Sequence, residues 1–287
     1  MAVAVVTDTT SYLPGDLAEA NQIHLVSLYV VFGGERTVRE ADITDYDAFF
    51  EELRGTEQLP TTSQPSVGDF MAVWEPLLER GDGVVSIHIS GGISGTVQSA
   101  QQAAEQLERE GKGGDRVRVI DSATSAGGLG LVALAAARAA ARGASLDEVV
   151  TAANEARASL KMWFAIDTLE FLRRSGRIGA ASAWLGSTLK IKPILTLESE
   201  MAPVERVRTS KRAFERMVDY ARQRHSSGMN GWVVQHIQAP DQAAALADRC
   251  REIFGHDAVF TSEIGPVLGA HTGPGLLGVG SIDESLL

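Results

Sequence analysis

The first half of the chain alternates short apolar runs with longer amphipathic segments. Val3–Val6, Gly83–Ile89 and Val117–Ile120 have the length and β-branched content of buried strands, and each ends in a polar loop. Such an alternation favours a parallel sheet with helices on its faces. The same patterns predict a buried strand over His24–Phe32 and helices over Leu13–Ala20, Asp45–Leu53, Ser66–Glu79, Thr96–Glu110, Gly127–Arg142 and Ser145–Leu160.

The second half has apolar runs with fewer helical segments between them. Strands are predicted over Met162–Ile166, Leu189–Leu197, Gly231–Ile237, Ala258–Ile264 and Leu276–Ile282, and helices over Ser210–Arg222 and Pro240–Phe254. Fewer crossover helices favour a mixed sheet. The predicted fold class is α/β with two α/β domains. Residues 1–160 form a mostly parallel, Rossmann-like sheet with helices on both faces, and residues 161–287 form a mixed sheet with helices.

Charge and composition exclude several classes of protein. The 287 residues carry a formal net charge of −11, which argues against binding to nucleic acid or anionic membranes. The single cysteine, Cys250, allows no internal disulfide and suits a reducing compartment. The most apolar stretch, Gly128–Ala141, contains Arg138 and is too short to span a bilayer, so it indicates a buried Ala-rich helix. We expect a cytoplasmic protein with no integral membrane segment and no signal peptide.

Candidate binding residues lie in loops beyond the carboxyl ends of strands, where ligands bind in open α/β sheets. Ser94, Gly95 and Thr96 open a predicted helix, where free backbone N–H groups and the positive end of the helix dipole favour an anion. The alternative is that Ser94 or Thr96 only caps that helix. Hydroxyl- and glycine-rich loops are expected at Thr7–Ser11, Thr61–Ser66, Ser90–Thr96 and Asp121–Ser125.

Two further segments contain candidate side chains. Thr62 lies in Thr61–Ser66, which two prolines keep out of a helix and in which only Ser66 is placed as a helix cap. The alternative is an ordinary polar turn. His271 lies among glycines and prolines in Gly265–Gly275, which we interpret as a loop. The alternative for His271 is a hydrogen-bonded structural histidine.

Other kinds of site find little support. The six histidines lack the spacing of metal ligands, so we expect no metal. No GxGxxG motif opens a strand-to-helix unit, as it does in dinucleotide-binding proteins, and the GxxxxGK(S/T) phosphate-binding loop is absent, so we expect no cofactor. Arg173 and Arg177 form a basic run in an acidic chain, and Arg206 and Arg208 lie in a second one. Such clusters are usually solvated, but they are also candidate contacts for a phosphate or an acidic partner.

Taken together and in chain order, these motifs resemble the DegV family of bacterial fatty-acid-binding proteins, which includes FakB-type subunits. The segments that carry the resemblance are Val6–Pro14, Thr62–Ser66, Ile93–Ala100, Asp121–Ser122, Leu169–Ile178, Lys192–Leu195 and Gly265–Gly275. Each motif alone is weak, but seven in this order are specific, and they cover essentially the whole chain.

The resemblance implies a protein that binds one long-chain fatty acid, such as palmitate or oleate, with its acyl chain in an apolar tunnel. It implies that Thr62 and Ser94 hold the carboxylate, that Gly95 and Thr96 at the same helix start also belong to the carboxylate-binding site, and that His271 lies near the head group. Residues 1–160 would carry the carboxylate-binding loops, and residues 161–287 would cover the acyl chain.

The resemblance also implies a carrier rather than an enzyme. In some bacteria such proteins present the acyl chain to a separate fatty acid kinase, which makes an acyl-phosphate for phospholipid synthesis. Arg173, Arg177 and Arg208 are then candidate contacts for the phosphate or the kinase.

Two alternatives remain open from the residues. The first is a serine acyl-ester hydrolase with Ser94 as nucleophile and His271 as base. The second is a phosphotransferase subunit that acts only with a partner, against which the missing phosphate-loop motif argues.

Overall fold

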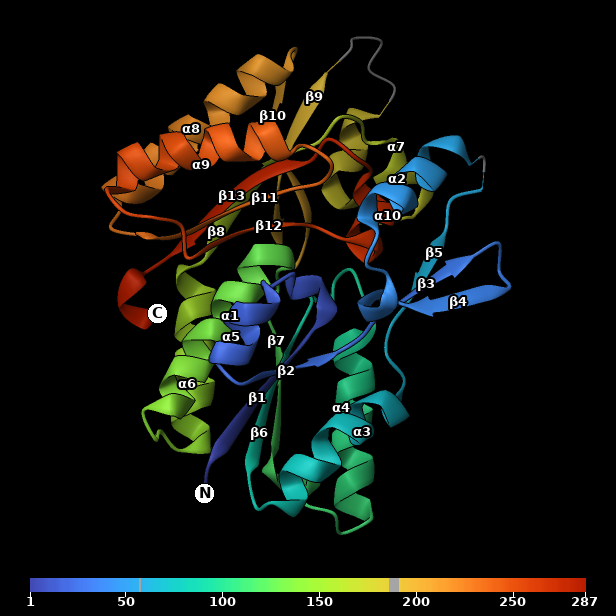
Figure 1. The fold of residues 1–287 in the computed structure, drawn as a ribbon, viewed down its shortest axis with the longest axis vertical. Coiled ribbons are helices and arrows are strands. Elements are labelled where there is room, and N and C mark those ends of the chain that lie inside the picture. The colour runs from blue at the N-terminus through green and yellow to red at the C-terminus, as the bar shows by residue number, and fades with distance from the viewer. Residues whose placement is uncertain (57, 186–190) are drawn as a thin grey trace.

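The computed structural model describes residues 1–56, 58–185 and 191–287 (Figure 1). Its strands are β1 Val3–Asp8, β2 Ile23–Val26, β3 Tyr29–Phe32, β4 Arg36–Arg39, β5 Thr61–Ser63, β6 Gly83–His88, β7 Val117–Asp121, β8 Lys161–Ala165, β9 Lys192–Glu198, β10 Glu200–Val207, β11 Gly231–His236, β12 Phe260–Glu263 and β13 Leu277–Ile282. Its helices are α1 Gly15–Ala20, α2 Tyr46–Gly55, α3 Val67–Glu79, α4 Thr96–Arg109, α5 Ala126–Ala141, α6 Leu146–Ser159, α7 Glu170–Arg174, α8 Ser210–Ser226, α9 Pro240–Phe254 and α10 Pro266–Thr272.

A four-stranded parallel sheet, in the order β2-β1-β6-β7, forms the N-terminal half. Successive side chains of a strand point to opposite faces. Val6 and Val84 accordingly pack with α3 and α4 on one face, whereas Val5 and Val85 pack with α5 and α6 on the other. The predicted parallel sheet with helices on both faces is confirmed.

A six-stranded mixed sheet, in the order β10-β9-β8-β13-β11-β12, forms the C-terminal half. Its neighbouring strands are antiparallel except for the parallel pair β11 and β12. Helices α8 and α9 cover its outer face (Figure 1). This confirms the predicted mixed sheet.

The Ala-rich helix α5 lies between the two large sheets (Figure 1). It contacts β1 and β6 of the parallel sheet and β11 and β13 of the mixed sheet. A methyl group at Gly130 would lie 2.9 Å from Phe260, so the small residues of α5 allow close packing on both sides. The prediction of a buried Ala-rich helix is confirmed, and none of the described helices is both long and apolar enough to cross a membrane.

The predicted single strand His24–Phe32 is wrong. The chain turns at Ser27 and Leu28, so that β2 joins the parallel sheet and β3 joins a separate antiparallel sheet in the order β4-β3-β5. The backbone groups of Leu28 bond to the Thr9 hydroxyl and to the backbone N–H of Glu40, which ends one strand before the next begins. An unbroken apolar run therefore serves two sheets.

Two segments expected to be loops belong to regular elements. Thr61–Ser63 is the edge strand β5, which pairs with β3. His271 lies in the last turn of α10 and not in a loop. That helix can begin at Pro266, because the backbone N–H that proline lacks has no partner within the first turn of a helix. Strands β4 and β10 and helix α7 were not predicted, and the predicted strand Leu189–Leu197 begins outside the described residues.

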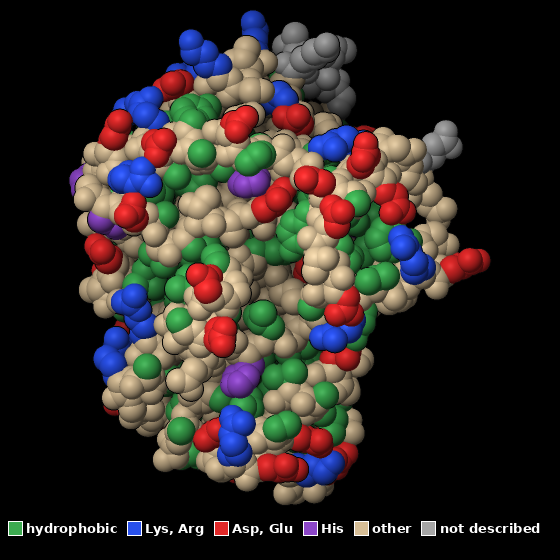
Figure 2. Space-filling view, in the orientation of Figure 1, with side chains coloured by type: hydrophobic (Ala, Val, Ile, Leu, Met, Phe, Trp, Pro, Cys, Tyr) green, Lys and Arg blue, Asp and Glu red, His purple; other side chains and the backbone are tan. Residues whose placement is uncertain are grey.

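The parallel sheet ends at Asp121 and the mixed sheet begins at Lys161, and the domain boundary after residue 160 stays a prediction. Charged side chains of both signs are interspersed over the face shown in Figure 2, so the net negative charge is not gathered into one acidic patch there.

Candidate functional site

A pocket between the parallel sheet, the small sheet and α10 contains most of the predicted site residues. It holds about 540 Å³ of empty space, open solvent included. We call it the polar pocket, and it is lined by Leu28, Thr62, Ser63, Gln64, Ile89, Ile93, Ser94, Gly95, Leu172, Arg177, Met201, Val267, Leu268, His271 and Thr272. Thr62, Ser94, Gly95, His271 and Arg177 thus come together from four separate segments.

The side chains of Thr62 and His271 form a hydrogen-bonded pair in this pocket. Thr62 Oγ1 lies 2.7 Å from His271 Nε2. The other ring nitrogen, Nδ1, is buried and has no hydrogen-bond partner among the residues that the structure describes. Because no third group orients the ring through Nδ1, this pair differs from the dyad of a catalytic triad.

The imidazole of His271 is neutral at physiological pH. Burial lowers its pKa from 6.5 to about 4, and the positive charge of Arg177 lowers the pKa in the same direction. A neutral imidazole with this pKa is a weak general base near pH 7. It can still hold a hydroxyl group in a fixed orientation.

Ser94 and Thr96 form the second hydroxyl pair, at the start of α4. Their side-chain oxygens lie 2.8 Å apart, and Ser94 Oγ also accepts a 3.3 Å hydrogen bond from the backbone N–H of Thr96. Thr96 is fully buried, whereas Ser94 is half-buried and lines the polar pocket. Thr96 therefore lies behind Ser94 and fixes its side chain.

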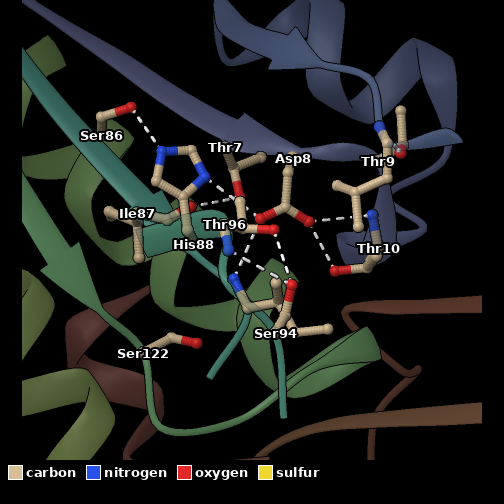
Figure 3. Close-up of polar contacts among 12 residues, drawn as sticks. Thr7, Asp8, Thr9, Thr10, Ser86, Ile87, His88, Ser94, Thr96 and Ser122 are labelled. Atoms are coloured by element: carbon tan, nitrogen blue, oxygen red, sulfur yellow. Dashed lines mark hydrogen bonds and ion pairs between the residues drawn. The ribbon is translucent and has the colours of Figure 1, made fainter. Parts of the chain in front are cut away.

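The segment before Ser94 is anchored by a buried polar chain that the sequence analysis missed (Figure 3). Ser86 Oγ lies 2.7 Å from His88 Nε2, and His88 Nδ1 lies 3.1 Å from Asp8 Oδ2. The same Asp8 oxygen accepts the backbone N–H of Ile89 at 2.9 Å, and the other accepts the backbone N–H of Thr10 at 3.0 Å. The three side chains are fully buried, so this Ser-His-Asp chain supports the strand ends and is closed to a substrate.

Further bonds hold the loop between Ile89 and Ser94. Ser90 Oγ donates a 2.6 Å hydrogen bond to the backbone oxygen of Ser199, in the turn between β9 and β10. Gly91 N–H donates to Asp121 at 3.2 Å. A methyl group on Gly92 would lie 2.3 Å from the Ser199 oxygen, so only glycine allows this close approach. The loop that positions Ser94 is thereby fixed to both large sheets.

An apolar cavity adjoins the polar pocket. Met201, Leu268 and Thr272 line both spaces. The apolar cavity lies between α5 and the mixed sheet and holds about 490 Å³ of empty space, open solvent included. Its other lining residues are Ser125, Ala126, Met162, Phe164, Val233, Gln235, Ile264, Leu276, Gly278, Val279 and Gly280. The arrangement offers one end with hydroxyl groups and one end with apolar side chains.

The predicted basic contacts lie in different places. Arg177 is exposed and lines the polar pocket. Arg173 is exposed outside the pocket and forms a 2.6 Å ion pair with Glu170. Arg208 is exposed just after the end of β10. The structure therefore brings only Arg177 to the binding residues.

The hydrolase alternative lacks its central contact. Within the described part of the chain, no hydrogen bond joins Ser94 to His271, whose Nε2 faces Thr62 instead. A serine nucleophile needs its base within hydrogen-bond reach. In the described ranges, no group of three or more His, Cys, Asp or Glu side chains could hold a metal ion.

Similar proteins cover the whole fold. A DegV domain-containing protein of Streptomyces coelicolor is 42% identical over 280 residues, which are 96% of this chain and 97% of that protein. A DegV family protein of Thermus thermophilus, described by its fatty acid binding, has a structure with a TM-score of 0.87 and 36% identity, covering 98% of this chain and 99% of that one. The structure of DegV from Bacillus subtilis, named a fatty acid binding protein, gives the same values.

The family comparison agrees with these relatives. The model of the DegV family, whose description is "Uncharacterised protein, DegV family", matches residues 2–284. The family resemblance read from the seven motifs is confirmed: the chain belongs to the DegV family.

Proposed function

We propose that this protein binds one long-chain fatty acid, with the carboxylate in the polar pocket and the acyl chain in the apolar cavity. The observation that carries the proposal is that the two spaces lie next to each other, since Met201, Leu268 and Thr272 line both. Similar proteins from Thermus thermophilus and Bacillus subtilis are described as fatty-acid-binding.

The free energy of binding a fatty acid would come from both spaces. Burying methylene groups gains about 0.8 kcal/mol each, so a long acyl chain supplies a gross gain on the order of 10 kcal/mol. The carboxylate then needs hydrogen-bond donors, because an unpaired charge next to an apolar cavity is costly. Each hydrogen bond to a charged group contributes about 1.5–3 kcal/mol.

The hydroxyl groups of Thr62 and Ser94 are the proposed donors. If His271 carries its proton on Nε2 and donates it to Thr62 Oγ1, the Thr62 hydroxyl proton is left for a carboxylate. This tautomer also leaves a lone pair, and not an N–H, at the buried and unpartnered Nδ1. If Thr96 Oγ1 donates to Ser94 Oγ, the Ser94 proton is free in the same way.

We further propose that the bound acid is presented to a separate fatty acid kinase. The exposed Arg177 at the polar pocket supports this step, because a guanidinium pairs well with a phosphate group. Arg208 and Arg173 are proposed as contacts for the kinase surface.

The binding proposal is tested on protein purified from cells. Native mass spectrometry should show a mass excess that organic extraction removes and identifies as a free fatty acid. The double variant Thr62→Val with Ser94→Ala should lose this occupancy while its thermal unfolding stays cooperative. Full occupancy in the folded double variant would contradict the assignment of these two hydroxyl groups.

The kinase proposal needs its own assay. The loaded protein is mixed with a fatty acid kinase and ATP, and acyl-phosphate formation is followed. Arg177→Glu and Arg208→Glu should lower the rate of acyl-phosphate formation per molecule of bound acid, whereas Arg142→Glu, on an exposed residue after α5, should not. Equal rates for the three variants would contradict the proposal.

A further inference from the structure

We infer that the side chain of Met162 forms the wall between the apolar cavity and a cleft on the protein surface, and that it limits the length of the bound acyl chain. The inference rests on the proposed fatty-acid binding. It concerns the part of the apolar cavity that Met162 and Gly280 line.

The surface cleft lies directly beyond Met162. It holds about 1050 Å³ of empty space, open solvent included, and its lining includes the polar side chains of Asn154, Arg157 and Lys161. Met162 lines both this cleft and the apolar cavity. Its side chain therefore separates an apolar interior from a wet surface.

Met162 is well held in this position. It lies in β8, is 8% exposed, and pairs across the sheet with Gly280, which has no side chain to fill the same space. Its sulfur lies 3.3 Å from the hydroxyl oxygen of Thr124, which donates to it. Its backbone oxygen accepts a 2.8 Å hydrogen bond from Thr196.

The side chain of methionine is flexible, so the position of this wall depends on its conformation. The unbranched thioether side chain has three rotatable bonds, and its sulfur accepts only a weak hydrogen bond from Thr124. A shorter side chain at this position would join the cavity to the cleft. An acyl chain too long for the closed cavity could then extend through the opening.

The experiment is a competition between palmitate and docosanoate for delipidated protein, with the bound fraction of each measured by native mass spectrometry. Wild-type protein should favour palmitate, since the longer chain meets the wall. Met162→Ala should shift the ratio toward docosanoate by about tenfold or more. Several methylene groups of the longer chain can then be buried, and each contributes about 0.8 kcal/mol to the binding free energy.

Met217→Ala is the matched control. Met217 is a fully buried methionine of α8 that packs in a separate core, so its truncation should lower stability without changing the ratio. Met162→Val keeps a strand-favouring residue and should shift the ratio in the same direction if Met162→Ala does not fold.

The outcomes separate this inference from the proposed function. If neither acid binds to the wild-type protein, the proposed function fails and this inference with it. If palmitate binds to the wild-type protein and the ratio stays the same in the folded Met162 variants, the inference alone is overturned.

Discussion

Thr62 and His271 are 209 positions apart in the chain, yet Thr62 Oγ1 lies 2.7 Å from His271 Nε2. The bond joins edge strand β5, in the N-terminal half of the chain, to the last turn of α10, in the C-terminal half. It therefore connects two distant segments at one side of the polar pocket. Because the ring is neutral, the bond sets the direction of the Thr62 hydroxyl without adding a charge.

The loss of the Thr62 hydroxyl should weaken fatty-acid binding. Thr62→Val keeps the shape of the side chain but removes one donor to the carboxylate, which costs about 1.5–3 kcal/mol, or about 10-fold to 100-fold in affinity. Binding of palmitate is measured by titration calorimetry. Thr61→Val, on the exposed neighbour in the same strand, is the control and should bind as the wild type does. Equal affinities for the two variants would contradict the role of Thr62.

Acidification should destabilise the ligand-free protein partly through His271. The folded-state pKa is about 4 and the ordinary value is 6.5, so between these values the unfolded state takes up a proton that the folded state does not. The stability that a neutral His271 contributes is therefore lost as the pH falls from 6.5 to about 4.

Urea unfolding at pH 7 and at pH 5 checks this prediction. The free energy of unfolding should fall more for the wild type than for His271→Phe, which cannot titrate. Other groups that titrate in this range affect both proteins alike, so the difference between them isolates His271. The same loss in both would show that its pKa is not lowered.

Local patterns predicted the elements whose residues have a regular periodicity. Strands β1, β6 and β7 and the long helices follow from apolar spacing, because burial of one face decides their structure. Strand β10 was missed because Glu200–Val207 contains three charged residues and a proline, and only its pairing with β9 makes it a strand. Helix α10 was missed because its proline and glycine resemble loop residues.

Contacts between distant segments were harder to predict. Thr62, Ser94 and His271 were chosen from motifs, but nothing local shows that Thr62 faces His271 and that Ser94 faces Thr96. Ser86 and His88 did carry a signal, since two polar residues at spacing two lie on one face of an apolar strand. Their partner Asp8 follows only from the register of β1 against β6.

A rise in pH should destabilise the protein through Glu40. This buried carboxylate accepts hydrogen bonds from Thr9 at 2.6 Å, Tyr12 at 2.7 Å and the backbone N–H of Val267 at 2.8 Å, and so holds the start of α10. Burial raises its pKa above the ordinary 4.5, although the hydrogen bonds oppose the shift. Above pH 4.5 the unfolded state therefore ionises first, and unfolding becomes more favourable as the pH rises.

Glu40→Gln tests this prediction, because glutamine has nearly the same shape and does not titrate. The free energy of unfolding is measured at pH 5 and at pH 8 for both proteins. The wild type should lose more stability over this interval than the variant. Parallel curves would mean that Glu40 has an ordinary pKa in the folded protein.

Asp8→Asn should destabilise the fold and loosen the segment that leads to Ser94. The two oxygens of Asp8 accept from the backbone N–H groups of Ile89 and Thr10 and contact the ring of His88. An asparagine NH₂ group would face donors in place of one oxygen, and a buried donor left without its acceptor costs about 1–3 kcal/mol. We therefore expect a lower free energy of unfolding, weaker palmitate binding and faster hydrogen exchange at the Ile89 amide.

Asp16→Asn is the matched control, since Asp16 is exposed in the first turn of α1 and its side chain accepts a hydrogen bond from the next backbone N–H, that of Leu17. Its removal should cost about 0.3–1 kcal/mol, the usual value for a charge at a helix start. Exchange at Ile89 and palmitate affinity should stay at wild-type values in this control. If Asp8→Asn behaves as Asp16→Asn does, the Ser86–His88–Asp8 chain does not hold the binding loop. A third outcome is that the free energy of global unfolding falls and hydrogen exchange at the Ile89 amide rises only as much as this fall explains. The Ser86–His88–Asp8 chain then supports the sheet and not the position of Ser94.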